Sequence, residues 1–185
     1  MLRINLGCGP RAAPGWLNCD LRALPGVDLQ MDLRRGLPLA AASADCLAAI
    51  HVLQDLAWHE IGAALSELHR VLKPGGVLRV AVPDLERALR AYLERDSAWF
   101  YVPDRDAASL GAKLVTQIVW YGSVRTPFTF EFLEERLAAA RFGRIRRRAF
   151  GQSGLDGLAA LDNRQRETLF VEAVKENAGG HLAPS

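Results

Sequence analysis

Strand-like and helical patterns alternate along most of this chain, and this order constrains the fold more than any other feature. Short apolar or alternating runs that favour strands occur at residues 2–6, 16–21, 27–33, 46–53 and 77–82. Before the last of these runs, apolar residues recur at helical spacings of three and four, at Ile61, Leu65, Leu68 and Leu72. Strands that alternate with helices form a mostly parallel sheet. The pattern therefore predicts an α/β domain with a doubly wound, mostly parallel sheet.

The second half of the chain adds further helices and two last strands. Asp84 is placed to cap a helix, and Thr129 precedes a helical pattern over about 130–140. Two strands are predicted at 144–150 and 168–174, joined by a loop over 151–166. We expect one domain over residues 1–176, with a less regular insert at 96–129 and a disordered tail at 177–185.

The composition is that of an ordinary globular protein. The 185 residues are 50% hydrophobic and 24% charged, which suits one domain with a sizeable core. The sequence has no apolar run of about 20 residues that would span a membrane and no secretory signal pattern. Cys8, Cys19 and Cys46 lack the spacing of a disulfide framework or a zinc site, so no metal is expected. We expect a cytoplasmic protein, with no membrane partner.

The turn Gly7-Cys8-Gly9 directly follows the first predicted strand, where open α/β sheets bind ligands. Residues 10–15 include two prolines and a glycine, which leave no room for a helix before the next strand. Without a helix N-terminus the turn lacks the dipole that favours a pyrophosphate, so NAD, FAD and ATP are disfavoured. S-adenosylmethionine (SAM) carries no phosphate, and its carboxylate suits the backbone N–H groups of such a turn.

Acidic residues at two strand ends fit the rest of SAM. Asp20 ends the second predicted strand, where a carboxylate can accept hydrogen bonds from both ribose hydroxyls. Asp32 ends the third and is expected to accept from the adenine amino group, although it also fits the start of a loop. The side-chain oxygen of Asn5 is expected to help bind the ammonium group.

Five segments in this order resemble the class I SAM-dependent methyltransferases, and the small bacterial type 11 branch in particular: INLGCGP, GWLNCD, VDLQMDL, HVLQDL and LHRVLKPGGVLRVAVPDL. The resemblance covers nearly the whole chain and is strongest over residues 2–93. It implies a Rossmann-like, seven-stranded sheet of order 3-2-1-4-5-7-6, with SAM across its middle. The predicted cofactor-binding residues are Asn5, Gly7, Cys8, Gly9, Asp20, Leu21, Asp32, Leu33, His51 and Val52.

The chain departs from the family's usual pattern at several positions. Gln54-Asp55 stands where relatives usually have glutamate and histidine, Arg11 replaces a third glycine, and Arg125-Thr126 stands where a histidine is expected. These departures bear on catalysis more than on SAM binding. A non-catalytic SAM-binding subunit with a regulatory or interaction role is therefore the alternative function.

The predicted activity is methyl transfer from SAM to an O, N or S nucleophile of a small molecule, such as a sugar or a secondary metabolite. His51 follows the fourth predicted strand, near the expected position of the sulfonium, and is the predicted catalytic base. Tyr121 and Asp55 are alternative bases. Residues 99–132 hold eight of the fourteen aromatic side chains, so the insert is predicted to cover the substrate.

Nucleic acid is a disfavoured partner. The net charge is only +2, and the one arginine cluster is predicted to be a solvated face without interleaved aromatic residues; it comprises Arg141, Arg144, Arg146, Arg147 and Arg148. RNA methylation remains a less favoured alternative, and we expect a monomer or a homodimer. Two elements that usually wall the cofactor have no counterpart in the pattern, a leader helix and the helix after Gly9. We therefore expect an open cofactor site, covered by residues 96–129 or by a second subunit.

Overall fold

A computed structural model describes residues 1–176 of the chain; the tail predicted at 177–185 lies outside the described residues. The described residues form one seven-stranded sheet of order β3-β2-β1-β4-β5-β7-β6, as the resemblance implied. The strands from β3 to β5 are parallel, and β7 is antiparallel to both β5 and β6. Their bounds are β1 (Arg3–Leu6), β2 (Leu17–Asp20), β3 (Leu29–Gln30), β4 (Ala44–Ile50), β5 (Leu72–Pro83), β6 (Phe142–Arg148) and β7 (Thr168–Lys175). This confirms the predicted α/β class with a mostly parallel sheet.

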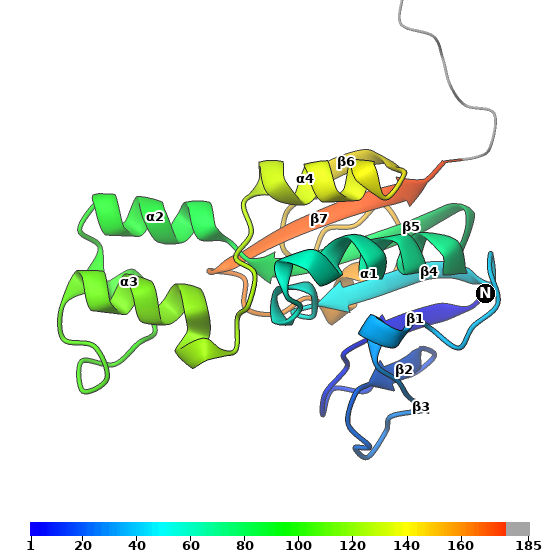
Figure 1. Cartoon of the computed structure of the whole chain (residues 1–185), viewed down its shortest axis with the longest axis horizontal. Coiled ribbons are helices and arrows are strands. Elements are labelled where there is room, and N and C mark those ends of the chain that lie inside the picture. The colour runs from blue at the N-terminus through cyan, green and yellow to red at the C-terminus, as the bar shows by residue number, and fades with distance from the viewer. Residues whose placement is uncertain (177–185) are drawn as a thin grey trace, which may run out of the picture.

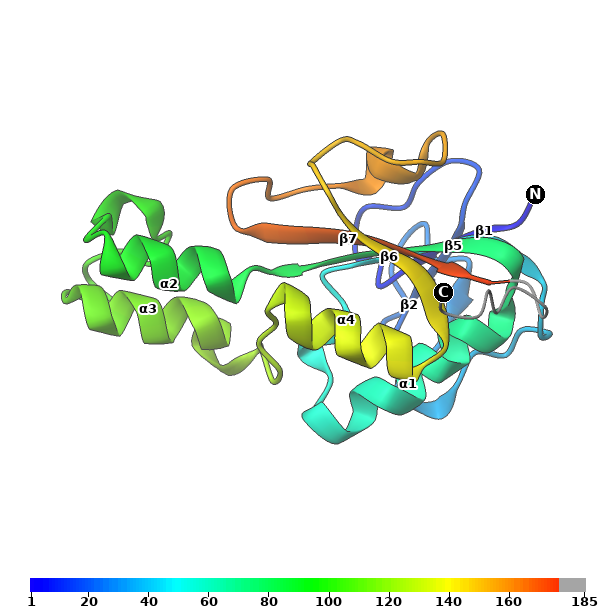
Figure 2. The same cartoon turned by 90° about the horizontal axis from the view of Figure 1, so that it is seen from above.

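Helices α1 (Trp58–Val71) and α4 (Phe130–Ala139) pack on one face of the sheet (Figures 1 and 2). The helical spacing in α1 places its apolar side chains in the core, where Ile61, Leu65 and Leu68 are fully buried. Glu60 closes the start of this helix by accepting a hydrogen bond from the Ala57 N–H at 2.7 Å. In the described part of the chain, no helix is long and apolar enough to cross a membrane.

The opposite face of the sheet is covered by a loop instead of helices. As predicted, the described residues contain no helix between β1 and β2. The segment between β6 and β7, which includes the short 3₁₀ turn η5 (Leu158–Leu161), crosses this face (Figure 2). Leu158 is fully buried there, in a small apolar cluster with Ile50 of β4 and Phe170 of β7. The β6–β7 loop therefore supplies the apolar cover that a helical layer would give.

A buried charge cluster anchors this loop to the sheet. Arg79 of β5 is completely buried, and its Nε donates to Asp162 Oδ1 of the loop at 2.7 Å. Its Nη1 donates to Glu172 Oε1 of β7 at 2.9 Å and to the Gln152 carbonyl of the loop at 3.0 Å. Paired and hydrogen-bonded in this way, the guanidinium is tolerated without water.

The insert at 96–129 lies beyond one end of the sheet. It follows helix α2 (Leu85–Leu93) and contains α3 (Leu110–Val119), which packs beside α2 (Figure 1). Two short 3₁₀ turns, η3 (Ser97–Trp99) and η4 (Trp120–Gly122), flank α3. Asp84 caps α2 by accepting from the Arg87 N–H at 3.1 Å, as predicted.

Four predicted strands have wrong boundaries. The strand predicted at 46–53 is β4, which ends at Ile50, and Leu53 instead begins the 3₁₀ turn η2 (Leu53–Asp55). The third strand is only two residues long, because the Asp32 side chain accepts from the Arg34 N–H and begins the 3₁₀ turn η1 (Leu33–Arg35). Strand β5 begins at Leu72 because residues 73–76 form a bulge between the pairs Ala44–Leu72 and Cys46–Val77. Strand β6 begins two residues earlier than predicted, at Phe142, where it pairs with Lys175.

The arginine cluster, which lies along β6 except for Arg141 just before it, is only partly a solvated face. Arg147 forms an ion pair with Glu86 of α2, and its guanidinium lies over the ring of Phe130. Arg148 pairs with the buried Glu172 at 2.8 Å. Two of the five arginines therefore contribute to packing between elements.

Candidate cofactor and substrate site

A cavity of about 470 Å³ opens at the carboxyl ends of β1, β2 and β4. This volume is within the range of small-molecule and cofactor sites, about 300–1,000 Å³. Seven of the ten predicted cofactor residues line it: Gly7, Asp20, Leu21, Asp32, Leu33, His51 and Val52. Its other lining residues are Leu6, Arg22, Met31, Arg34, Asp55 and Leu56. We call it the cofactor cavity.

The backbone at Gly7 is shaped so that only glycine fits. Its φ of +60° lies in the left-handed region, and a Cβ at this position would overlap the Cγ2 methyl of Val52. The missing side chain keeps the turn against β4 and leaves its backbone open to the cavity. Gly9 also has a positive φ, of +55°, and its N–H donates to Asp20 Oδ2 at 2.8 Å.

The carboxylate of Asp20 is fixed at the edge of the cofactor cavity. Besides Gly9 N–H, it accepts from the Arg22 N–H at 2.9 Å through Oδ1. Burial raises its pKa, but the backbone N–H groups of Arg22 and Gly9 and the Arg22 guanidinium outweigh burial and hold the pKa below its ordinary value. An ionised, immobilised carboxylate with further lone pairs suits a ribose diol. The cavity, the glycine backbone and this carboxylate together fit SAM.

The carboxylate of Asp32 is more strongly engaged within the protein. Its two oxygens accept from Arg34 Nε and Nη2, both at 2.8 Å. The hydrogen bond from the Arg34 side chain is the main cause of its lowered pKa. An adenine amino group would have to share these oxygens with the Arg34 guanidinium. Asp32 therefore stabilises its own loop, in addition to the adenine contact that is predicted for it.

Three predicted cofactor residues lie outside the cofactor cavity. Asn5 and Cys8 line a separate cavity of about 280 Å³ behind the glycine turn, which also has Gly7 in its wall. Asn5 Nδ2 donates to Asn18 Oδ1 at 3.0 Å, and this leaves Asn5 Oδ1 as the free end of the amide. Burial raises the pKa of the Cys8 thiol, which stays neutral. Gly9 lines neither cavity and acts through its bond to Asp20.

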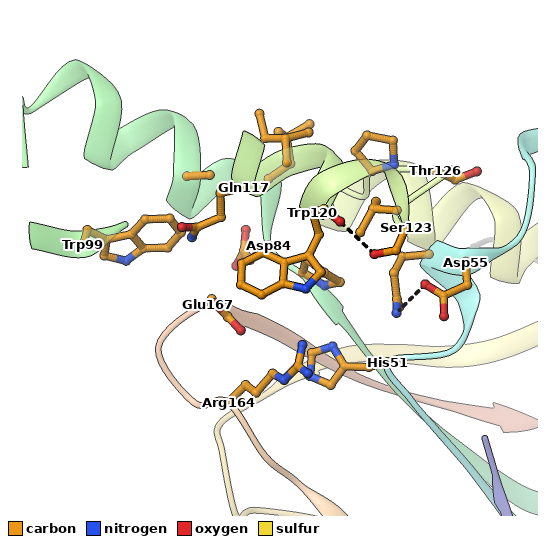
Figure 3. Close-up of a pocket in the computed structure, with 17 residues that line it drawn as sticks. His51, Asp55, Asp84, Trp99, Gln117, Trp120, Ser123, Thr126, Arg164 and Glu167 are labelled. Carbon is orange, nitrogen blue, oxygen red and sulfur yellow. Dashed lines mark hydrogen bonds between the residues drawn. The ribbon is translucent and has the colours of Figure 1, made fainter. Parts of the chain in front are cut away.

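A second cavity, of about 270 Å³, lies beside the first and under the insert (Figure 3). We call it the substrate cavity. Eight of its lining residues come from the insert: Trp99, Gln117, Ile118, Trp120, Ser123, Val124, Thr126 and Pro127. The others are His51, Gln54, Asp55, Pro83, Asp84, Leu85, Ala88, Arg164 and Glu167. The insert therefore forms much of the wall that faces the end of the sheet.

His51 and Asp55 line both cavities, so they lie at the boundary between them. The backbone of His51 is left-handed, with a φ of +56°, and turns its side chain out of β4 at the strand's end. The Thr168 hydroxyl donates to the Arg164 carbonyl at 2.7 Å and lies 3.3 Å from His51 Nε2. Because that hydroxyl hydrogen is engaged, the network assigns the imidazole proton to Nε2 and leaves a lone pair on Nδ1.

The two boundary residues have oppositely shifted pKa values. Burial, aided by the charge of Arg164, lowers the pKa of His51 to about 4. Burial raises the pKa of Asp55, although a hydrogen bond from Gln54 and the charge of Arg164 oppose this. Near neutral pH His51 is therefore uncharged, and Asp55 accepts a proton more readily than an ordinary carboxylate.

Tyr121, the other predicted base, lines neither cavity. Its side chain is exposed, and its hydroxyl donates to Asp106 Oδ2 at 2.7 Å. Arg164 and Glu167 line the substrate cavity but could not be recognised from the sequence, because both lie in a segment without a helical or strand pattern. Trp99 and Trp120 belong to the aromatic run that was noted, but nothing in the sequence selected these two.

Comparisons with known proteins agree with this fold. Residues 11–80 match the family model described as a methyltransferase domain. A SAM-dependent methyltransferase from Thermotoga maritima, described as a possible histamine N-methyltransferase, is 19% identical; the match covers 95% of this chain and 82% of that one, with a TM-score of 0.60. None of the curated proteins compared with the chain matches it.

Two further solved structures show the same fold. A SAM-dependent methyltransferase from Mesorhizobium loti is 19% identical over 94% of this chain and 90% of its own, with a TM-score of 0.56. One from Archaeoglobus fulgidus is 12% identical over 94% and 86%, with a TM-score of 0.60. The predicted resemblance is confirmed: residues 11–80 match a methyltransferase domain, and the chain has the fold of the class I SAM-dependent methyltransferases. SAM is the cofactor of this class, as predicted.

Proposed function

We propose that the methyl acceptor of this methyltransferase is a small molecule with an O, N or S nucleophile, bound in the substrate cavity. The observation that carries the proposal is that two cavities of different character meet at His51 and Asp55. One has the glycine backbone and the carboxylate that suit SAM, and the other has an aromatic wall. A nucleophile at the boundary would face the methyl group.

The residues of the cofactor cavity bind and orient. Asp20 is positioned to accept from the ribose hydroxyls, and the open backbone at Gly7 lets the cofactor lie against the sheet. When bound, SAM supplies an electrophilic methyl group next to a sulfonium. Catalysis then depends mainly on alignment of the nucleophile at about 3 Å from the methyl carbon.

His51 and Asp55 have different roles in this proposal. The lowered pKa of His51, about 4, makes it a weak proton acceptor, so it serves mainly as an uncharged wall with a hydrogen-bond acceptor at Nδ1. Asp55, with its raised pKa, is better suited to accept a proton from the nucleophile. The base role first predicted for His51 is therefore assigned to its alternative, Asp55.

The shape of the substrate cavity supports a small substrate. Its volume of about 270 Å³ suits a compact molecule, and the insert closes it on one side. The proposal also retains a cytoplasmic location and a monomer or homodimer. All three cysteines are buried and unbridged, which suits a reducing compartment.

Titration calorimetry with SAM and with its demethylated product tests cofactor binding. We expect both to bind, and Asp20→Ala to weaken binding by at least tenfold. The matched control Asp156→Ala removes an exposed carboxylate from the β6–β7 loop and should leave binding unchanged. If SAM does not bind, the proposal fails. SAM binding without methyl transfer to any small-molecule acceptor would instead favour the non-catalytic alternative.

A further inference from the structure

The charged groups of the substrate cavity are mostly acidic. Its wall contains the carboxylates of Asp55, Asp84 and Glu167 and a single guanidinium, that of Arg164. His51 also faces it but is uncharged near neutral pH. Asp84 is neutralised within the protein, because its Oδ2 lies 3.3 Å from Arg87 Nε. Asp55 and Glu167 are therefore the two carboxylates that remain for a ligand.

Neither of these carboxylates has a cationic partner within the described residues. Asp55 Oδ1 receives one hydrogen bond, from Gln54 Nε2 at 3.2 Å. Burial raises the pKa of Glu167, against the opposing charges of Arg164 and Arg166. A partly buried anion without a partner is unfavourable, so a cation in this cavity would stabilise the charged forms of both carboxylates.

Gln54 gives an independent indication of a hydrogen-bond donor. It lines the substrate cavity and is 5% exposed, and its Oε1 has no hydrogen-bond partner among the described residues. Its amide cannot simply be turned over, because Oε1 would then face the Asp55 carboxylate. A buried acceptor without a donor destabilises the protein. A ligand with N–H groups would meet this need.

Two indole rings complete the cavity. Trp99 comes from η3 and Trp120 from η4, at the two ends of the segment that contains α3. Figure 3 shows the carboxylates of Asp84 and Glu167 between the two indoles in this view. The face of an indole attracts cations, ammonium groups included. Acidic and aromatic groups in one small cavity are the combination that binds an organic cation.

We infer that the acceptor is a small organic amine that is protonated in solution, bound between the two indoles with Glu167 near its charge. This inference rests on the proposed function. The ammonium group first loses one N–H proton to the Asp55 carboxylate. The nitrogen lone pair then forms the N–C bond with the methyl carbon as the C–S bond breaks, and that electron pair remains on sulfur. The product leaves as a protonated N-methylamine, and Asp55 returns its proton to solvent.

The test compares three probes of similar shape and different charge. Phenethylamine is cationic, 2-phenylethanol is neutral and phenylacetate is anionic near neutral pH. Calorimetry on the full chain, with and without saturating demethylated cofactor, measures their binding. We expect phenethylamine to bind at least tenfold more tightly than either of the others. Equal or tighter binding of the alcohol or the acid overturns the inference.

Variants connect this selectivity to the carboxylates. Glu167→Gln keeps the shape of the side chain and should weaken phenethylamine binding at least fivefold, with 2-phenylethanol binding unchanged. The control Glu135→Gln removes an exposed carboxylate of α4 that lines neither cavity, and it should change nothing. Thermal unfolding confirms that each variant is folded. Unchanged amine binding in a folded Glu167→Gln protein also overturns the inference.

The outcome is separable from that of the proposed function. SAM binding is measured on its own, and probe binding is measured both without and with cofactor. If SAM binds and the amine is not preferred, the amine inference fails and the methyltransferase proposal stands. If the amine is preferred but incubation with SAM yields no N-methylphenethylamine by mass spectrometry, and the same holds for other small aryl amines, the transfer step of the inference is overturned.

Discussion

The guanidinium of Arg79 and the carboxylate of Asp162 form a buried ion pair that joins the middle of the sheet to the β6–β7 loop. Their side chains are 0% and 1% exposed, and Asp162 also accepts from the Gly151 N–H at 2.9 Å. The pair closes the loop on itself and fixes it to β5. Removal of one partner from such a pair leaves a buried charge without compensation, which strongly lowers stability.

Asp162→Ala should therefore strongly destabilise the protein. Removal of one partner from a buried ion pair costs about 3–5 kcal/mol, and we expect the lower end because Glu172 still pairs with Arg79. Chemical denaturation measures the loss of unfolding free energy. The control Asp156→Ala removes an exposed carboxylate of the same loop and should change stability little. A loss below about 1 kcal/mol for Asp162→Ala would contradict the anchoring role.

Gly7→Ala should weaken both folding and SAM binding. The new Cβ would overlap Val52 Cγ2 and would sit on a left-handed backbone, so the turn must shift into the cofactor cavity. The matched control is Gly62→Ala in α1, where no atom lies within 4 Å of the added Cβ. That change should stabilise the protein by about 0.5–1 kcal/mol. Calorimetry measures SAM binding by both variants, and thermal unfolding measures their stability. Normal SAM binding by Gly7→Ala would show that the turn does not border the cofactor site.

Asp20→Asn and Asp32→Asn should affect SAM binding unequally. An amide at position 20 turns its NH₂ group toward either the Gly9 or the Arg22 N–H, both of which now donate to the carboxylate. At position 32 the change mainly loses the ion pair with Arg34 on a partly exposed surface. We expect a loss of at least about tenfold for Asp20→Asn, equivalent to 1.4 kcal/mol, and a smaller one for Asp32→Asn. Equal losses of SAM affinity in the two variants would instead indicate that Asp32 contacts the adenine directly.

The stability of the protein should fall between about pH 6.5 and pH 4 through His51. Its folded-state pKa of about 4 lies below the ordinary 6.5, so the unfolded chain binds a proton in this window while the folded one does not. The stabilisation is complete above pH 6.5 and is lost as the pH falls to about 4. At roughly 1.4 kcal/mol per pKa unit, the loss is on the order of 2–3 kcal/mol.

Denaturation at several pH values, with His51→Leu as the comparison, measures this contribution. The variant has no imidazole to protonate, so its stability should fall less over the same window. The carboxylates titrate in both proteins, and the difference between the two curves isolates His51. Parallel curves would mean that the imidazole is hydrated and titrates normally in the folded protein.

The sheet could be predicted because its signals are local. The turn at Gly7 and the apolar run of β4 each indicate a buried strand. The strand order followed from the resemblance to a known class. The short third strand could not be predicted, since an Asp32 side chain that caps Arg34 competes with strand pairing only once both are in place. The same holds for the bulge at the start of β5.

Seven of the predicted cofactor residues line the cofactor cavity, whereas Arg164 and Glu167 of the substrate cavity carry no signal in the sequence. Gly7 and Asp20 follow strands directly, so their positions come with the sheet. Glu167 and Arg164 reach the substrate cavity because the β6–β7 loop is folded across the sheet by the distant Arg79, a contact between residues 83 positions apart. No local pattern encodes such a contact, and the burial that shifts the pKa of His51 depends on it too.

The β6–β7 loop thus has two tasks: it covers one face of the sheet and borders the substrate cavity. Asp162 locks it to the sheet, and two residues later Arg164 begins the stretch that borders the substrate cavity. Local opening of this loop would expose the face of the sheet opposite α1 and α4 and would at the same time remove one wall of the substrate cavity. Occupancy of the pocket should accordingly slow amide hydrogen exchange along β5 and β7, including at positions that do not line the pocket.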